Sequence, residues 1–354
     1  MKVDRLTDER MSEKVSVVVP VLNRKTLLGR TLSSISEQSW RPLQIVVVDN
    51  GSTDGTYEEA LRLADKFNAE EGLEIKVIQQ SERGASRARN SGFHNVSGEI
   101  VLFFDSDDIM MTDAIRTYMQ TFTEHPEIDM VIAPFYWLLD DGKRNKRRIR
   151  RGDLLTNHFH HCLLSTQSFA AKRKFLSRVE SRHGGLWPEN LGVWDDWALG
   201  MRLLMCCPKV VILKRCVALV EPQAQSITGE AYCQTPPEQY FDAIADVSNT
   251  LNSHNELSPK QRAHWENLIL YRKVMVAGLL AQESKRMSDD IISRSAFSSR
   301  EEMERESRRL LDSILASSPN GFCRGILKLA YRYIKAGCRG CALWVTPLLK
   351  NYPL

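Results

Sequence analysis

Residues 101–108, Val-Leu-Phe-Phe-Asp-Ser-Asp-Asp, constrain the fold of this chain more than any other stretch. The four apolar residues predict a buried strand of a mostly parallel sheet, because such strands are covered on both faces. The three aspartates then stand at the carboxyl end of the strand, where open α/β sheets bind their ligands. The stretch therefore predicts an α/β fold with an acidic site at one edge of its sheet.

The chemistry of that acidic site follows from the repulsion between its carboxylates. Asp105 and Asp107 project to the same side of an extended chain, so a cation between them is favoured. Mg²⁺ and Mn²⁺ prefer oxygen ligands and also bind the phosphates of a substrate. We therefore expect a divalent metal that joins the protein to a diphosphate. An acidic turn that only ends the strand is the plainer alternative.

Three more apolar runs precede this strand and alternate with helical patterns. Residues 15–19, 43–48 and 73–78 are the expected strands, and their alternation with helices implies βαβ units in a parallel sheet. Asp49 ends the second run, where its carboxylate is suited to accept a hydrogen bond from a base N–H, as in uracil. Stabilisation of its own turn is the alternative role. Residues 130–139 predict one further strand.

Several function classes are disfavoured by what the sequence lacks. No G-x-G-x-x-G follows a strand and no G-x-x-x-x-G-K-[ST] occurs, so neither a dinucleotide fold nor a P-loop enzyme is indicated. The net charge of +4 over 354 residues is small, which argues against nucleic acid as a partner. The length is sufficient for one large domain and a smaller one.

A second acidic group consists of Asp195 and Asp196, between Trp194 and Trp197, and leucines at helical spacing follow it. The helix dipole favours acids in a first turn, which explains one aspartate but not an adjacent pair flanked by tryptophans. The pair is therefore a candidate functional site. These two tryptophans and Trp187 either offer a flat apolar face to an acceptor sugar or pack against the helical C-terminal part of the chain.

Seven basic residues fall within residues 143–151, directly after the turn at Asp141 and Gly142. Such a run is usually a solvated hairpin. It is also suited to contact anionic lipid or a phosphate-bearing acceptor.

From residue 230 onward the pattern predicts helices, near residues 238–252, 260–288, 299–317 and 321–335.

The tail after Asp312 has six basic residues and no acidic one. Five of the six recur every three or four residues, on one stripe of a helix: Arg324, Lys328, Arg332, Lys335 and Arg339. A basic amphipathic helix is typical of a segment lying on an anionic membrane. Its other side is expected to be apolar, namely Ile326, Ala330, Tyr333, Ile334 and Gly337. The alternative is that the apolar side packs on the catalytic domain and the basic stripe is only solvated.

The N-terminal residues lack the apolar core of a signal peptide, and no apolar run reaches the ~18 residues of a membrane span. Both features favour the cytoplasm, where the eight cysteines are expected to be thiols. Cys338 and Cys341 form a C-x-x-C, but no second ligand pair stands at metal spacing, so a zinc site is not favoured.

Five segments together resemble the inverting glycosyltransferases of family 2, and they occur in the order of that family. They are residues 15–23 (VSVVVPVLN), 46–56 (VVVDNGSTDGT), 84–92 (GASRARNSG), 104–108 (FDSDD) and 194–197 (WDDW), with Arg202 after them. The likeness covers residues 15–228. It implies a GT-A fold, a mostly parallel sheet with flanking helices, for a catalytic domain of residues 1–229. Residues 230–354 then form a helical C-terminal extension.

The resemblance also implies roles for the residues that bind the donor. Pro20 and Asn23 correspond to the loop against the nucleotide, and Asp49 corresponds to the acid that reads the base. Arg89 lies in the segment that approaches the diphosphate.

The remaining implied roles concern the metal and the proton. Asp105, Ser106 and Asp107 match the D-x-D that holds Mn²⁺ or Mg²⁺ with the nucleotide sugar, and Asp108 stands beside them. Asp196 matches the general base, and Asp195 and Trp194 support it.

The sequence departs from the family pattern at two places. The residue before the base is often Glu in the family and is Asp195 here. A His that reaches the metal or diphosphate in many members is replaced by Gln223, so no ligand is assigned at that position.

The expected reaction is transfer of a sugar, with inversion, from a nucleoside diphosphate to a hydroxyl group of a glycan or lipid-linked glycan. UDP is favoured over GDP or dTDP, although thymine presents the same N–H to Asp49. We expect the neighbouring Asp195 and partial burial to raise the pKa of Asp196. A sugar nucleotidyltransferase is a weaker alternative, because residues 20–25 lack the glycines that hold a triphosphate. A catalytically inert nucleotide-sugar-binding subunit is another, although none of the expected acids is lost.

Overall fold

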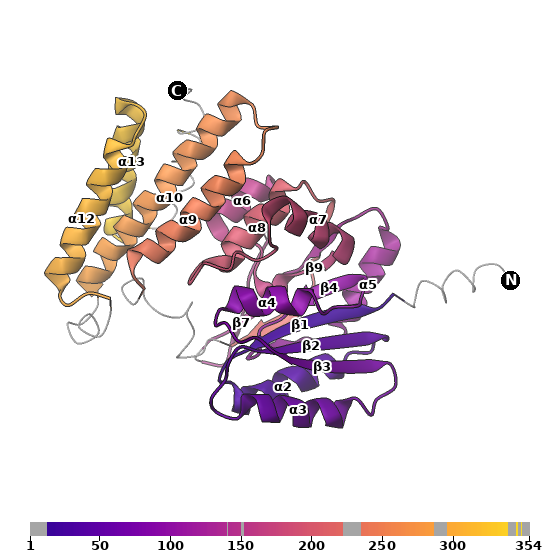
Figure 1. Ribbon diagram of the computed structural model, residues 1–354. Helices are drawn as coiled ribbons and strands as arrows, with labels where there is room; N and C mark the ends of the chain where they lie inside the picture. Colours follow the sequence, from indigo (N-terminus) through magenta and orange to yellow (C-terminus); the bar gives the residue numbers. More distant parts are fainter. Residues whose placement is uncertain are drawn as a thin grey trace. The chain divides into compact units, whose positions relative to one another are not determined.

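The computed structural model describes residues 13–139, 141–149, 152–221, 235–286, 296–338, 345 and 348 (Figure 1). The chain divides into two compact units. The first consists of Met1–Asn190 and Asp195–Pro222, and the second of Leu191–Trp194 and Gln223–Leu354. The predicted domain boundary at residues 229 and 230 lies outside the described residues.

The first unit is built on a seven-stranded sheet in the order β10-β6-β9-β4-β1-β2-β3. Its strands are β1 (Val15–Val21), β2 (Leu43–Asp49), β3 (Leu73–Gln79), β4 (Ile100–Phe103), β6 (Met130–Ile132), β9 (Phe169–Lys172) and β10 (Val210–Ile212). Strands β1 to β4 pair in parallel, and only β9 runs antiparallel to its neighbours β4 and β6. The predicted mostly parallel α/β sheet is confirmed.

Successive residues of the central strands point into two separate cores, which explains their unbroken apolar runs. Val17 belongs to the core covered by α2 (Lys25–Ser36) and α3 (Thr56–Phe67). Val18 belongs to the core on the other face, which α4 (Ala85–Phe93) covers (Figure 1). At Gly92 on α4 a Cβ would lie 2.3 Å from Val18 Cγ1, so only glycine permits this close approach.

The prediction of one strand over residues 130–139 is wrong. Pro134 interrupts the run, since it has no N–H to donate to a ladder, and β6 and β7 (Tyr136–Leu138) lie in different sheets. The second sheet has the order β5-β11-β7-β8. Its other strands are β5 (Ile109–Met110), β11 (Ala218–Val220) and β8 (Arg144–Lys146). The basic run therefore begins in the β7–β8 hairpin.

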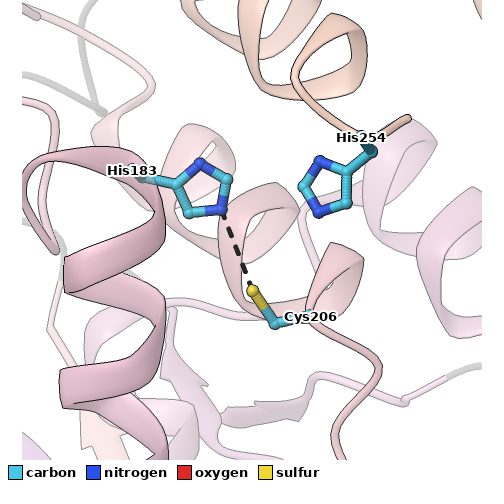
Figure 2. Close-up of side chains that lie close together, drawn as sticks. All are labelled: His183, Cys206 and His254. Atoms are coloured by element: carbon cyan, nitrogen blue, oxygen red, sulfur yellow. Dashed lines mark hydrogen bonds between the residues drawn. The ribbon is translucent and has the colours of Figure 1, made fainter. Parts of the chain in front are cut away.

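The remaining elements of the first unit are α5 (Ala114–Glu124), α6 (Leu154–His161), the 3-10 turn η1 (Thr166–Ser168), α7 (Arg173–His183) and α8 (Asp195–Met205). The end of α7 and the end of α8 meet where His183 Nε2 lies 3.9 Å from Cys206 Sγ (Figure 2). The buried Arg202 of α8 donates to Gly185 O at 2.9 Å. These contacts fix α8, the helix that begins with the aspartate pair.

The second unit is helical, as predicted. Its helices are α9 (Pro237–Asn252), α10 (Pro259–Arg286), α12 (Arg300–Ala316) and α13 (Gly321–Lys335). Helix α10 contacts the other three. Trp194 belongs to this unit, where its ring meets the Tyr240 ring edge-on at 4.9 Å and lies 4.3 Å from the Arg272 guanidinium. His254, also drawn in Figure 2, hydrogen-bonds through Nδ1 to Thr250 O at 2.8 Å.

No helix within the described residues combines the length and the hydropathy that a membrane crossing requires. Six of the cysteines are described, and all six are free thiols. Cys338 is exposed, and Cys341, its partner in the C-x-x-C, lies outside the described residues.

Candidate active site

The acidic stretch after β4 forms a turn at the carboxyl edge of the large sheet. Asp105 accepts hydrogen bonds from Arg89 Nη2 and Gln167 Nε2, both at 3.0 Å. Asp108 is 2% exposed and accepts from the same Gln167 amide and from Glu221 N at 3.4 Å. These two aspartates are therefore held by the protein itself.

Asp107 lies in a different environment. Its Oδ2 accepts from Arg24 Nε at 3.3 Å, and its backbone oxygen accepts from Arg30 Nη2 at 2.9 Å. About a fifth of its side chain is exposed (20%), whereas Ser106 beside it is buried. Within the described residues, the side chain of Asp107 accepts only this 3.3 Å hydrogen bond from Arg24, whereas Asp105 and Asp108 each accept from two groups.

The pKa shifts of this turn bear on the expected metal. Burial raises the pKa of Asp105, against the opposing effect of Arg89, and Asp107 raises it further. Burial and the charges of Asp105 and Asp107 raise the pKa of Asp108 well above its ordinary value. Negative charge is thus unfavourable here without a compensating cation. Carboxylate oxygens are the ligands that Mn²⁺ and Mg²⁺ prefer, so the residues fit the expected metal.

The second acidic group opens α8, as the sequence predicts. Asp195 Oδ2 accepts from Arg89 Nη1 at 2.6 Å, and Asp196 Oδ1 accepts from Thr166 Oγ1 at 3.1 Å. The residue before them, Trp194, has a φ of 59°, in the left-handed region that is costly for a bulky side chain. Asp196 nevertheless keeps part of its surface exposed.

The electrostatics of Asp196 suit a general base. Burial, followed by the charge of Asp195, raises its pKa to about 7, against the opposing effects of Arg89 and the Thr166 hydroxyl. This confirms the expected direction of the shift. An acid with a pKa near the working pH combines a useful fraction of ionised form with enough proton affinity for general base catalysis.

Arg89 brings the two acidic groups together. Its guanidinium donates to Asp105 on one side and to Asp195 on the other, and it stacks over the Trp187 ring at 4.4 Å. Arg89 is 7% exposed. A buried guanidinium with two carboxylates is a strong, geometrically defined contact, so the predicted metal acids and the predicted base belong to one site.

The residues expected near the nucleotide lie in the loops after β1 and β2. Asp49 is 1% exposed; its Oδ2 accepts from Ser52 N at 3.3 Å, and its buried Oδ1 has no hydrogen-bond partner among the described residues. Asn23 (φ 52°) accepts from Thr53 N at 2.8 Å and joins the two loops. Pro20 lies near the end of β1, opposite Val48 of β2.

One alternative raised by the sequence is wrong for two of the three tryptophans. Trp187 and Trp197 are each 1% exposed, so neither offers a face to an acceptor sugar. Trp187 packs edge-on against Phe103, and Trp197 donates through Nε1 to Phe159 O at 2.9 Å. Both are buried core residues that support the residues of the site.

Three polar residues of the site were not predicted from the sequence. Arg24 follows Asn23 directly and could have been noticed as a cation next to a nucleotide loop. Thr166 and Gln167 lie in an unremarkable polar stretch before β9, and no spacing in the sequence connects them with the aspartates.

The sequence and the fold are similar to those of known proteins. Residues 16–182 match the model described as glycosyl transferase family 2. The chain is 36% identical over 126 residues to the glycosyltransferase GlyA of Streptococcus pneumoniae, covering 36% of this chain and 17% of GlyA. It is 34% identical over 180 residues to GlyG of the same organism, covering 51% of this chain and 53% of GlyG. The chain thus spans about half or less of the length of these relatives.

The fold as a whole also has a counterpart among solved structures. The crystal structure of S. aureus TarS 1-349 in complex with UDP-GlcNAc is similar, with a TM-score of 0.61 at 18% identity, over 92% of this chain and 91% of the other. This likeness supports the GT-A type of fold with a helical C-terminal region.

Proposed function

We propose that this protein is a glycosyltransferase that transfers a sugar with inversion, because residues 16–182 match the glycosyl transferase family 2 model. The sugar moves from a nucleoside diphosphate, preferably UDP, to a hydroxyl group of a glycan or lipid-linked glycan. The observation that carries the proposal is the pair of contacts of Arg89, to Asp105 and to Asp195. These contacts join the acidic turn of Asp105, which is suited to bind the departing diphosphate, to the aspartate pair of α8, which is suited to remove a proton.

The transfer itself requires one displacement. Asp196 takes the proton from the acceptor hydroxyl as its oxygen attacks the anomeric carbon, and the bond from that carbon to the diphosphate oxygen breaks. The bonding electrons leave with the diphosphate, so the configuration at the anomeric carbon inverts. The pKa of about 7 at Asp196 supports this role, because an ordinary aspartate is a far weaker base.

Asp107 and Asp105 are the proposed ligands of the metal, Mn²⁺ or Mg²⁺. When bound, such an ion neutralises negative charge on the diphosphate. The position of Asp107, partly exposed and paired only loosely with Arg24 at 3.3 Å, suits a ligand that must be reached from solvent. Asp108, enclosed by Gln167 and Glu221 N, orients the turn.

Asp49 is the proposed reader of the base. Its buried, unpaired Oδ1 has a strong tendency to accept a hydrogen bond, since an unsatisfied buried acceptor costs free energy. The N–H of uracil satisfies it. The UDP-GlcNAc bound to TarS, a protein of the same fold, supports UDP as the nucleotide. Pro20 and Asn23 form the proposed wall against which the nucleotide lies.

The β7–β8 hairpin supports an acceptor that carries phosphate, as a lipid-linked glycan does. Arg144 and Lys146 lie on one face of β8, since alternate residues of a strand do, and both are exposed. Strand β11 ends at Val220, next to Glu221, whose N–H contacts Asp108. Val220 pairs with Trp137 of β7, and the next residue of β7, Leu138, pairs with Arg144 of β8. Two strand spacings amount to about 10 Å, so the basic hairpin ends close to the donor acids.

Helix α13 supports peripheral contact with an anionic membrane. Its apolar side is buried in the helical unit; at Gly278 of α10 a Cβ would lie 2.9 Å from Ile334. Its other side exposes Arg324, Lys328 and Arg332, with Leu329 55% exposed among them. The proposed contact therefore rests on charge, at about 1 kcal/mol for each basic residue, and Leu329 adds a small apolar anchor.

A release assay for nucleoside diphosphate tests the proposed function. UDP-, GDP- and dTDP-sugars are offered with and without Mn²⁺, in the presence of short glycans and lipid-linked glycans. Metal-dependent release of UDP that requires an acceptor is the expected result. Binding of the nucleotide without any release under all conditions would support an inert binding subunit instead.

A further inference from the structure

Two adjacent side chains in the turn η1 reach both acidic groups of the site. Thr166 Oγ1 donates to Asp196 Oδ1 at 3.1 Å, and Gln167 Nε2 donates to Asp105 Oδ2 at 3.0 Å and also to Asp108. Neither residue belongs to the five segments that carry the resemblance to the family. A dipeptide thus touches the proposed base on one side and the acids of the proposed donor site on the other.

The turn is well suited to hold these contacts in place. Thr166 and Gln167 are 1% and 8% exposed. The turn is closed by Ser165 N, which donates to Ser168 Oγ at 2.8 Å, and by Ser168 N, which donates to Ser165 O at 2.8 Å. Strand β9 begins at the next residue and pairs with β4, the strand that leads to the acids. The turn η1 and the aspartates therefore lie at the same end of the antiparallel pair formed by β4 and β9.

The chemistry of the two side chains also fits their positions. Gln167 offers an amide N–H to two neighbouring carboxylates without bringing a positive charge. A lysine or arginine at that place would neutralise the acids and compete with a metal ion. The Thr166 hydroxyl stabilises the ionised form of Asp196 by a hydrogen bond. Other charged groups act on Asp196 as well: Asp195 on its own helix, Arg89 on α4 and Asp105 after β4.

We propose that Thr166 and Gln167 are positioning residues with separate tasks. Thr166 orients Asp196 through its hydroxyl hydrogen bond. Gln167 holds Asp105 and Asp108 in the geometry that a metal and a diphosphate require. The proposal rests on the proposed function of the same site, and it makes η1 the element that keeps donor and acceptor chemistry in register.

Paired substitutions test the separation. Thr166→Val keeps the shape of the side chain and removes the hydroxyl; it should lower kcat roughly 10-fold or more, the effect of one lost hydrogen bond to a charged group. It should also move the acid limb of the pH profile upward, because the ionised form of Asp196 loses a hydrogen bond, with unchanged Mn²⁺-dependent binding of UDP. Thr166→Ser restores the hydroxyl and should restore both kcat and the pH profile.

Gln167→Met should give the opposite pattern. Calorimetry should show Mn²⁺-dependent UDP binding weakened roughly 10-fold or more, the effect of lost hydrogen bonds to charged groups, while the acid limb stays where it is. Thr121→Val and Gln38→Met are matched controls, because both residues are buried and donate to backbone oxygens rather than to the aspartates. Thr121 donates to Thr117 O of α5, and Gln38 donates to Met111 O, one residue after β5. They should alter thermal stability alone.

The outcome separates this inference from the proposed function. If both variants change the same parameter, or neither differs from its control while Asp196→Asn and Asp107→Ala are impaired, the tasks assigned to Thr166 and Gln167 are wrong. If Asp196→Asn itself is fully active, the proposed function fails first.

Discussion

Arg89 Nη1 lies 2.6 Å from Asp195 Oδ2, and this contact ties the helix after β3 to the first turn of α8. The second arm of the same guanidinium reaches Asp105. A planar fork of this kind serves two carboxylates at fixed angles, which a lysine ammonium does not. Arg89 therefore fixes Asp195, the neighbour of the proposed base, relative to Asp105, a proposed metal ligand.

Arg89→Lys tests that dependence. The substitution keeps the charge but loses one of the two contacts, so we expect kcat/KM to fall at least ~10-fold. Steady-state kinetics of nucleotide release measure the effect. Arg62→Lys, at an exposed arginine of α3 paired with Glu59, is the control and should behave as the wild type. Equal activity of the two variants would contradict the bridging role.

Asp107→Ala removes the proposed metal ligand whose side chain, among the described residues, is held only by a 3.3 Å contact with Arg24. Mn²⁺-dependent binding of UDP should be lost, because the diphosphate then lacks a cation held by the protein. Isothermal calorimetry with UDP, with and without Mn²⁺, is the measurement. Asp65→Ala, at an exposed aspartate of α3, should leave binding intact. Persistence of the metal effect in Asp107→Ala would move the ligand elsewhere.

Asp196→Asn retains the size of the side chain but cannot accept the proton. It should lower kcat by roughly 10²–10⁴ with little change in UDP affinity. The wild type should gain activity as the pH rises through about 7, because only the ionised form is a base. Should Asp195→Asn be the inactive variant and Asp196→Asn remain active, the roles within the pair are reversed.

The same substitution should stabilise the fold at alkaline pH. The pKa of Asp196 is raised from 3.8 to about 7, so ionisation of the folded protein is disfavoured relative to the unfolded chain. The resulting loss of stability begins above pH 3.8, grows until about pH 7 and is constant beyond it. Asparagine does not ionise, so the variant does not lose stability in this way. The Tm of Asp196→Asn should therefore exceed that of the wild type more at pH 8 than at pH 5, as measured by calorimetry.

Asp49→Asn tests the reading of the base. An amide that presents its NH₂ to the N–H of uracil is repelled, whereas the carboxylate accepts that hydrogen bond. UDP should stabilise the wild type in a thermal-shift assay and stabilise the variant much less. GDP should have a small effect on both. Stabilisation of the wild type by GDP alone would refute the preference for uracil.

Charge reversal on the exposed side of α13 tests the membrane contact without disturbing its buried side. The triple variant Arg324→Glu, Lys328→Glu and Arg332→Glu should no longer pellet with anionic vesicles, since each site contributes about 1 kcal/mol to binding. The wild type should pellet at low salt and be released at high salt. Arg308→Glu on α12, also exposed, is the control for charge alone. Indifference of the wild type to vesicles would leave the basic stripe as solvated surface.

The sequence allowed prediction of the elements whose pattern is local. The apolar runs of β1, β2 and β4, the helices of the second unit and the aspartates at the start of α8 all follow from periodicity or turn chemistry. The interruption at Pro134 is not predicted by the pattern, because the apolar residues continue across it. The direction of the pKa shift of Asp196 was predictable, since an adjacent aspartate and burial act in the same sense.

What remained hidden depends on distant packing. Nothing in the local sequence says that Thr166 lies against Asp196, since these residues are 30 positions apart. Likewise, tryptophans near an acidic pair suggest a sugar platform, and only the fold shows that Trp187 and Trp197 are buried in the core. For α13, the periodicity of the sequence predicts a basic side and an apolar side. Which of these residues are buried depends on the tertiary contacts of the helix.

The short return of the chain into the helical unit at Leu191–Trp194 has a consequence for engineering. The two units are not consecutive in the sequence, because Leu191–Trp194 belongs to the helical unit. A chimera with a single junction after residue 222 therefore keeps these four residues of the original helical unit and combines them with foreign helices. Trp194 would then meet foreign side chains in place of Tyr240 and Arg272, one residue before Asp195. Exchange of helical units between related enzymes therefore requires two junctions, with the loop and the helices transplanted together.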